Sequence, residues 1–228
     1  MATFSDSFNR ANNDTVGNGW SEKELSPGNV RIDSATLNFP DSSAAAVAYR
    51  SRTSGFGRNN TTLLFEYKKD SDNTEFDGIS VSHDGSTRTA TVGVSLNFDA
   101  GNNTVYVYDG ATSKGNASFT FAAATWYYFK WDILSDNSMK VYINTTGTFT
   151  ESDLVLSISA FTPSSSDGGR WGIGNRRTGR FRNLTIYDTV QLLSAGNIKK
   201  INGIAWANVK KINNIAVANI KKVNGITA

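Results

Sequence analysis

The chain of 228 residues contains no cysteine, which excludes disulfides and thiolate chemistry, and its three prolines and 20 glycines exclude a collagen-like composition. Its net charge of +3 is divided unevenly, because residues 1–188 hold all 20 acidic and 17 of the 23 basic residues, whereas residues 189–228 hold six lysines. No segment approaches the roughly 20 apolar residues that span a bilayer, and the first residues do not resemble a signal peptide. We therefore expect a protein that is made in the cytoplasm and does not insert into membranes.

Apolar and polar residues alternate along short segments of the first 188 residues. The period of two is clear in residues 63–67, 92–98 and 129–133. This period is typical of strands that bury one face. Turn sequences such as Asp109-Gly110 separate the segments. We predict about 12 to 14 short strands, packed as two sheets face to face in an all-β sandwich.

The two ends of this region match a family pattern. The opening FSDSFNRANNDTVGNGW resembles the opening of concanavalin A-like lectin/glucanase (LamG-like) sandwiches through Asp6, Phe8, Arg10, Gly17 and Trp20. The closing RFRNLTIYD is similar to their final strand, and TWYYFKWDI with SMKVYIN resembles a central strand pair of such domains. The resemblance implies a concanavalin A-like jelly roll over residues 1–190. It implies no single function, because this fold carries lectins, hydrolases and structural modules alike.

The glycine-punctuated segment GGRWGIGNRRTGRFRN is the predicted carbohydrate site. Sugar sites combine an aromatic face with amides and charged groups that bond hydroxyls. Trp171, Asn175, Arg176 and Arg180 supply these groups here. Two alternatives stay open: Trp171 alternates with Ile173 and faces the core, or the arginines pair with acids of an adjacent subunit.

Catalytic groups are scarce in this sequence. Hydrolases of the resembled family use an E-x-D-x-x-E pattern, and the nearest match has Glu75 and Asp77 but Ser80 in place of the general acid. A serine does not protonate a leaving oxygen near neutral pH. His83, the single histidine, lies beside a turn, where we expect a surface residue. We predict that the protein is not an enzyme, with a glycoside hydrolase as the less favoured alternative.

The resemblance also implies a calcium site. Some concanavalin A-like domains hold calcium near the first and last strands, and Asp6 and Asp188 occupy those places here. Calcium takes six to eight oxygen ligands, of which two carboxylates supply only part. No other cofactor is expected.

The C-terminal segment, residues 197–228, writes one 11-residue unit almost three times: NIKKINGIAWA, NVKKINNIAVA and NIKKVNGITA. So short a unit cannot bury its own apolar face, and it must stack on a neighbour or on another chain. These letters are similar to the IKKING-type repeats of predicted bacteriophage tail, fibre and capsid-associated proteins. The resemblance implies a virion protein.

Two conformations compete for the repeat. An 11-residue period fits a right-handed coiled coil, but the Asn-Gly pairs and the β-branched residues favour short strands joined by tight turns. We predict a β-repeat that follows a linker at residues 191–196 and assembles the chain into a trimer. The residues expected to form that interface are Ile198, Ile201, Ile204, Trp206, Val209, Ile212, Ile215, Ile220 and Val223. The paired lysines resemble a solvated face, and we expect no nucleic-acid partner.

These features predict a non-enzymatic structural protein of a bacteriophage virion, in a fibre, a tail or the capsid decoration. A lectin-like domain would project from the particle and bind polysaccharide of the host surface. The repeat would join copies of the chain to one another and to other virion proteins, after assembly in the host cytoplasm. A stand-alone carbohydrate-binding module is the alternative.

Overall fold

The computed structural model describes residues 2–40, 45–70, 76–86, 92–175, 178–191 and 193, together with the backbone of six two-residue strands between 200 and 227. In this part of the chain, no helix is long and apolar enough to cross a membrane.

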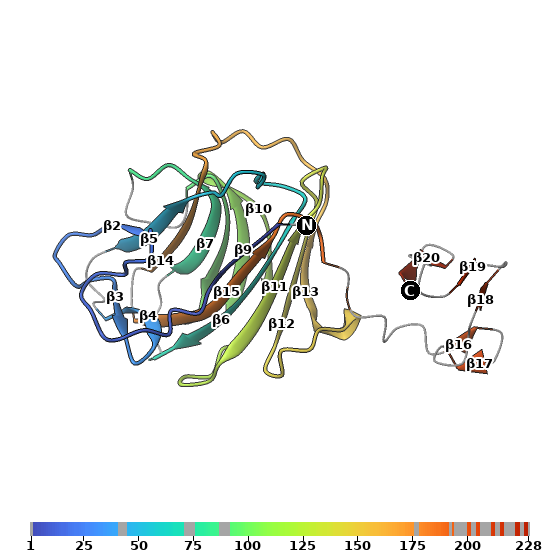
Figure 1. Ribbon diagram of the computed structural model, residues 1–228, viewed down its shortest axis with the longest axis horizontal. Coiled ribbons are helices and arrows are strands. Elements are labelled where there is room, and N and C mark those ends of the chain that lie inside the picture. The colour runs from blue at the N-terminus through green and yellow to red at the C-terminus, as the bar shows by residue number, and fades with distance from the viewer. Residues whose placement is uncertain are drawn as a thin grey trace.

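Two antiparallel sheets pack face to face (Figure 1). Sheet A has the order β13-β12-β11-β6-β15-β4-β3, with β1 also paired to β15, and sheet B has the order β10-β9-β8-β7-β14-β5-β2. The strands of sheet A are β1 (Thr3–Asp6), β3 (Arg31–Asp33), β4 (Thr36–Phe39), β6 (Thr61–Lys69), β11 (Tyr127–Ile133), β12 (Met139–Asn144), β13 (Leu154–Ile158) and β15 (Gly179–Tyr187). Those of sheet B are β2 (Ser21–Lys23), β5 (Ala46–Ser51), β7 (Phe76–His83), β8 (Val94–Asp99), β9 (Thr104–Asp109), β10 (Thr112–Ser118) and β14 (Arg170–Asn175). One 3-10 turn, η1 (Glu151–Asp153), precedes β13. The predicted all-β sandwich is confirmed.

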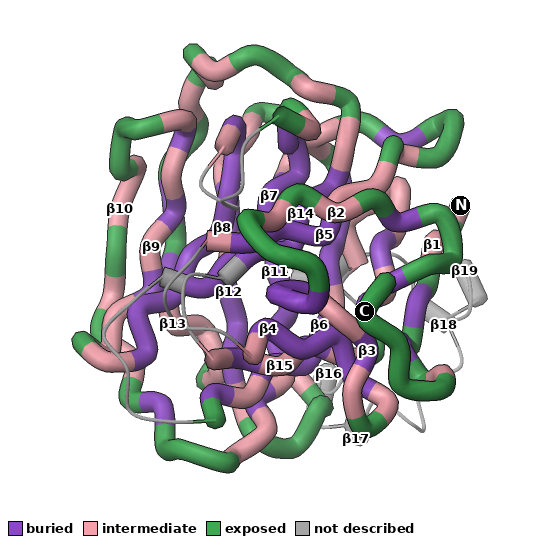
Figure 2. Tube along the Cα trace, turned by 90° about the vertical axis from the view of Figure 1, so that its left-hand side faces the viewer, coloured by how far each residue is buried: buried purple, intermediate pink, exposed green. Residues whose placement is uncertain are grey.

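An aromatic cluster fills the space between the sheets. The ring of Phe65 on β6 lies 4.7 Å from that of Phe129 on β11, and Phe98 of the opposite sheet lies 5.0 Å from Phe129. Burying each such side chain contributes about 1.5–3 kcal/mol. Figure 2 shows the buried positions along the central strands, whereas the edge strand β10 is exposed or half-buried. The alternation predicted for residues 63–67 and 129–133 thus points one face of these strands into the core, whereas Lys130 and Asp132 on the opposite face of β11 are also buried and form an ion pair.

The opening motif forms a network around one carboxylate. Asp6 accepts hydrogen bonds from the backbone of Phe8 (2.8 Å), from Arg10 (2.8 Å) and from the indole of Trp20 (2.9 Å). Burial alone would raise the pKa of Asp6, but these bonds and the Arg10 charge hold it below its ordinary value. Asp6 ends β1, which pairs with β15, so the network joins the first strand of the sandwich to the loop that follows it.

The residues after β15 stay on the sandwich. The backbone N–H of Gln191 donates to the hydroxyl of Thr62 at 2.8 Å. Leu193 lines a cavity of about 270 Å³ with Leu64 and Phe149. Part of the predicted linker is therefore packed against sheet A.

The repeat forms three two-stranded hairpins, as predicted from its Asn-Gly turns. They are β16 (Lys200–Ile201) with β17 (Ile204–Ala205), β18 (Lys211–Ile212) with β19 (Ile215–Ala216), and β20 (Lys222–Val223) with β21 (Ile226–Thr227). The preference for strands over a coiled coil is confirmed for these residues. Of the predicted interface, Ile198, Trp206, Val209 and Ile220 lie outside the described residues.

Candidate functional site

The outer face of sheet A carries a row of polar side chains. Phe181 is buried between Arg180 and Arg182 on β15, so both arginines point away from the core. Strand register places Arg180 beside Lys68 of β6 and beside Asn38 of β4, and Asn38 lies beside Arg31 of β3. The row continues at both ends into loops. We call it the polar strip, which consists of Asn12, Asp14, Arg31, Asp33, Ser34, Lys68, Asp70, Trp126, Arg180 and Arg182.

Trp126 forms the wall of a cavity at one end of the strip. This cavity has a volume of about 470 Å³ and is lined by Ser34, Lys68, Asp70, Trp126 and both arginines of β15, together with Thr36. The guanidinium carbon of Arg182 lies 3.9 Å from the centroid of the Trp126 ring, which is a close cation–π contact. The half-buried indole thus fixes the plane of a guanidinium group at the cavity wall.

Ion pairs hold the charged groups of this cavity in place. Arg180 donates through Nε to Asp70 at 2.7 Å and through Nη1 to Asp33 at 3.2 Å. Arg182 donates to Glu66 at 2.7 Å, and the Lys68 ammonium lies 3.5 Å from Asp70. A hydrogen bond from Ser34 and the adjacent Arg180 charge hold the pKa of Asp33 below its ordinary value. Each such surface pair adds little stability, about 0–1 kcal/mol, but together they fix where donors and acceptors point.

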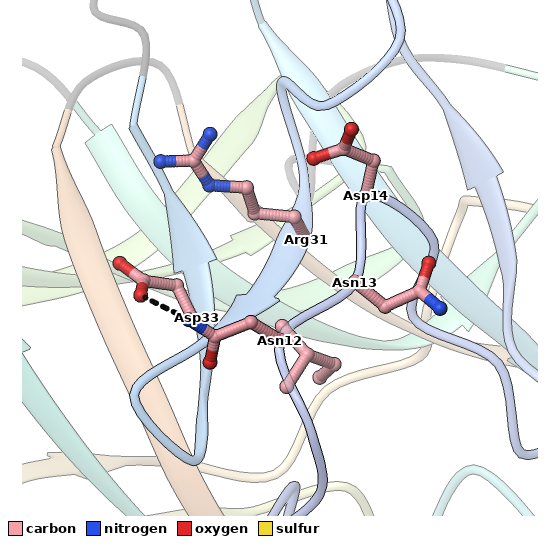
Figure 3. Close-up of a pocket in the computed structure, with 6 residues that line it drawn as sticks. Asn12, Asn13, Asp14, Arg31 and Asp33 are labelled. Atoms are coloured by element: carbon pink, nitrogen blue, oxygen red, sulfur yellow. Dashed lines mark hydrogen bonds between the residues drawn. The ribbon is translucent and has the colours of Figure 1, made fainter.

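A second cavity lies at the other end of the strip (Figure 3). It has a volume of about 320 Å³ and is lined by Asn12, Asn13, Asp14, Arg31, Ile32 and Asp33. Backbone hydrogen bonds between Asn13 and Ile32, at 3.0 and 2.9 Å, hold the 12–14 loop against β3. Arg31 and Asp14 extend on the same side of the chain (Figure 3), and neither makes an ion pair within the described part of the protein.

The two cavities adjoin one another. Asp33 lines the second cavity and binds Arg180 of the first. Asn12 lines the second and accepts a hydrogen bond at 2.9 Å from the backbone of Ser34, which lines the first. From β3 to β11 the strip crosses four strand spacings, or about 19 Å. It offers oriented hydroxyl, amide, carboxylate and guanidinium groups beside one aromatic ring.

The structure separates the residues of the predicted carbohydrate site. Arg180 lies in the polar strip, where its partners are acids of the same chain. Trp171 is on sheet B with 1% of its surface exposed, and its ring stacks on Phe4 at a centroid distance of 4.9 Å. Trp171 therefore faces the core, which was one of the two alternatives, and its ring offers no stacking surface to a sugar. Arg176 and the side chain of Asn175 lie outside the described residues.

The aromatic residue of the strip, Trp126, was not selected from the sequence. The sequence did indicate that Trp126 faces outward. Tyr127 and Phe129 are buried, and in a strand the side chains between buried positions, here Trp126 and Tyr128, point to the opposite face. The residues it meets lie far away in the sequence, and only the strand order brings Lys68 and Arg182 to it.

The two described residues of the hydrolase-like pattern, Asp77 and Ser80, are buried and hydrogen-bonded inside the protein. Asp77 is buried and accepts a hydrogen bond from the hydroxyl of Tyr67. Burial raises the pKa of Asp77 to about 8, although the Tyr67 bond opposes this. Ser80 is buried and donates to backbone carbonyl groups, including that of Val94 at 3.3 Å. Glu75 lies outside the described residues.

The expectation of a surface position for His83 is wrong. Its side chain is buried, with its ring stacked 5.5 Å from that of Tyr49. A register shift between β14 and β7 offsets this end of β7. Gly172 leaves room for the imidazole, because a β-carbon there would lie 2.8 Å from the His83 ring.

The two acids considered for calcium do not share a site. Asp6 pairs with Leu184 at one end of β1, whereas Asp188 accepts from the backbone of Ala2 at the other end, at 2.6 Å. Four residues of extended strand separate them by about 13 Å, and the Asp6 oxygens are already bonded to protein donors. In the part of the chain that the structure describes, no group of three acidic, histidine or cysteine residues is placed to hold a metal. This pair therefore does not fit the ion.

Comparison with known proteins identifies the fold. No family model and no curated protein sequence matches the chain. Among solved structures, the VIP36 exoplasmic/lumenal domain in its Ca²⁺- and Man2-bound form aligns with a TM-score of 0.58 at 7% identity, over 87% of this chain and 92% of that one. The Emp47p carbohydrate recognition domain aligns with 0.53 at 13% identity, over 82% and 95%. A sialidase aligns with 0.55 at 12% identity, over 82% of this chain but only 18% of the sialidase. The fold is thus a lectin-like jelly-roll β-sandwich, as the opening motif implied.

Proposed function

We propose that this protein binds carbohydrate through the polar strip, without catalysis, as the projecting domain of a bacteriophage virion protein. The observation that carries the binding proposal is the cavity in which Trp126 and Arg182 stack beside Asp70, Arg180 and Ser34. Aromatic faces pack against the apolar side of a sugar ring, while carboxylates, guanidinium groups and hydroxyls bond its hydroxyl groups.

The ion pairs of the strip favour binding. Because Arg180 and Asp70 already hold one another, a ligand meets oriented groups and loses less free energy in ordering side chains. The folds of VIP36, in its Man2-bound form, and of the Emp47p carbohydrate recognition domain support a sugar ligand. Each copy would bind weakly, and several copies on one particle would gain avidity.

A binding role without catalysis is supported by the hydrolase-like pattern. Asp77 points into the core, and Ser80 stands where a general acid would be required. Glycoside hydrolysis needs two carboxyl groups that reach the glycosidic bond. Asp77 is buried, and Ser80 has no carboxyl group.

The role in a virion is supported by the repeat. Its letters resemble those of phage fibre and capsid-associated proteins, and each hairpin consists of two strands of two residues. Hairpins of this size are not stable alone, which favours assembly with other copies in a trimer or with other virion proteins. A stand-alone carbohydrate-binding module is the second candidate, because every residue of the strip belongs to the sandwich.

Glycan binding is tested with a glycan array and the full-length protein. We expect Trp126→Ala to weaken binding of the best glycan about tenfold, through loss of the ring and of the Arg182 orientation. Trp126→Phe should retain most of the affinity. Leu25→Ala, a change at an exposed apolar side chain that lines neither cavity, is the matched control. Absence of binding by the wild type, or equal binding by Trp126→Ala, would contradict the proposal.

A further inference from the structure

The polar strip has a shape and a charge balance that specify its ligand further. We propose that it accommodates an uncharged, extended glycan chain, which lies across the strands of sheet A from the 12–14 loop to Trp126. This inference rests on the proposed function and adds the class of glycan and its direction on the protein.

The two cavities support an extended ligand. Trp126 lines one cavity and Arg31 lines the other, and their volumes are about 470 and 320 Å³. The Asp33–Arg180 ion pair and the hydrogen bond from Ser34 to Asn12 lie where the cavities adjoin. A single sugar ring occupies one cavity, whereas a chain running over these contacts reaches both.

The charges of the strip balance one another. In the first cavity, Arg180 is shared by Asp33 and Asp70, and Lys68 also pairs with Asp70. Arg182 is paired with Glu66. A carboxylated or sulfated sugar would compete with these acids for their cations and would leave an acid unpaired beside it.

In the second cavity the opposite charges of Arg31 and Asp14 also balance, although these two side chains form no ion pair. Arg31 and Asp14 line it together, and each lacks an ion-pair partner in the described part of the protein. An anionic group drawn to Arg31 would approach Asp14 as well. A sugar hydroxyl donates one hydrogen bond and accepts others, so it satisfies a carboxylate and a guanidinium at once. Neutral hydroxyl groups therefore match both ends of the strip.

The experiment uses the full-length protein and a glycan array that presents neutral, carboxylated and sulfated polysaccharides. Oligosaccharides of the best-bound glycan, from the disaccharide upward, are then titrated calorimetrically at about 50 mM and about 500 mM salt. The variants are Trp126→Ala at one end of the strip and Arg31→Ala at the other. Lys23→Ala, on the exposed edge strand of sheet B, is the matched control for removal of a cation.

We expect neutral glycans to bind best, with affinities that change less than about twofold between the two salt concentrations. Affinity should rise with chain length until the strip is filled. Arg31→Ala should weaken the longest oligosaccharide about tenfold and leave the disaccharide unchanged, whereas Trp126→Ala should weaken both.

Three results would overturn the inference: tighter binding of acidic glycans with a steep loss in salt, affinity independent of chain length, or an equal effect of Arg31→Ala on short and long oligosaccharides. All three would leave carbohydrate binding itself intact. Absence of binding to every glycan on the array would overturn the proposed function together with this inference.

Discussion

Asp77 is a buried carboxyl group that lies between Tyr67 of sheet A and the strands of sheet B. Its Oδ1 atom is buried and has no hydrogen-bond partner among the residues that the structure describes. Burial raises its pKa to about 8, the charge of Asp99 adds to this rise, and the Tyr67 bond opposes it. At neutral pH the neutral acid therefore predominates, which avoids most of the cost of a buried charge.

This raised pKa predicts a pH dependence of stability. The folded state keeps the Asp77 proton up to about pH 8, whereas an unfolded aspartate loses it near 3.8. The stabilisation is therefore complete below about pH 4, falls by up to about 1.4 kcal/mol per pH unit, and is lost above about pH 8. Urea unfolding across this range measures the slope.

The matched comparison uses two neutral substitutions. Asp77→Asn keeps a neutral polar group and should flatten the decline between about pH 4 and 8. Asp136→Asn, at an exposed turn, should leave the decline unchanged. Parallel curves for the wild type and Asp77→Asn would show that another group titrates.

At single positions, a period of two predicts which side of a strand a residue occupies only when one side is buried. It correctly placed Leu63, Phe65 and Tyr67 in the core. It left Trp171 undecided, because β14 is a central strand in which neighbouring positions are also covered. The expectation for His83 came from the adjacent turn and was wrong, since the register shift next to β7 has no signature in the sequence.

At the scale of elements, β15 and the segment after it form one unit with sheet A. The Gln191 N–H is bonded to Thr62, and Leu193 lies in a cavity with Leu64, Phe149 and Tyr187. The sequence suggested a linker at residues 191–196, because this segment carries no periodic signal. The sandwich therefore includes side chains that a boundary at residue 190 would remove.

Two truncations measure this contribution. A chain that ends at residue 193 should be more stable than one that ends at 188, because only the longer chain keeps the Gln191 bond and the Leu193 contacts. A difference of about 1–2 kcal/mol corresponds to a shift in Tm of roughly 2–8 °C for a domain of this size. Calorimetry measures both, and equal Tm values would contradict a stabilising role for residues 189–193.

At the scale of the whole molecule, the strip is a product of topology. It gathers side chains from the 12–14 loop, β3, β6, β15 and the residue before β11. Local patterns predict that each of these segments is a strand or a loop, but they do not state which strands become neighbours. For this reason the fold could be predicted from the sequence, whereas of the candidate site only Arg180 was named.

Oligomerisation through the repeat is also a property of the whole molecule. We expect light scattering to give the mass of a trimer for the full chain and of a monomer for a chain ending at residue 193, since three small hairpins cannot bury their apolar residues alone. A variant with Ile201, Ile212 and Val223 all changed to Ser tests the apolar face without removing the repeat. Trimers of the truncated chain, or monomers of the full chain, would contradict self-assembly by this segment.

The position of β15 has a mechanical consequence. This strand leads to the repeat, and it is bonded to β6 on one side and to β4 and β1 on the other. Tension applied through the C-terminal end therefore pulls along a strand held on both flanks, so that its hydrogen bonds are strained together instead of being peeled apart one after another. A protein anchored by its repeat and attached to a surface by the outer face of sheet A would resist unfolding by shear flow.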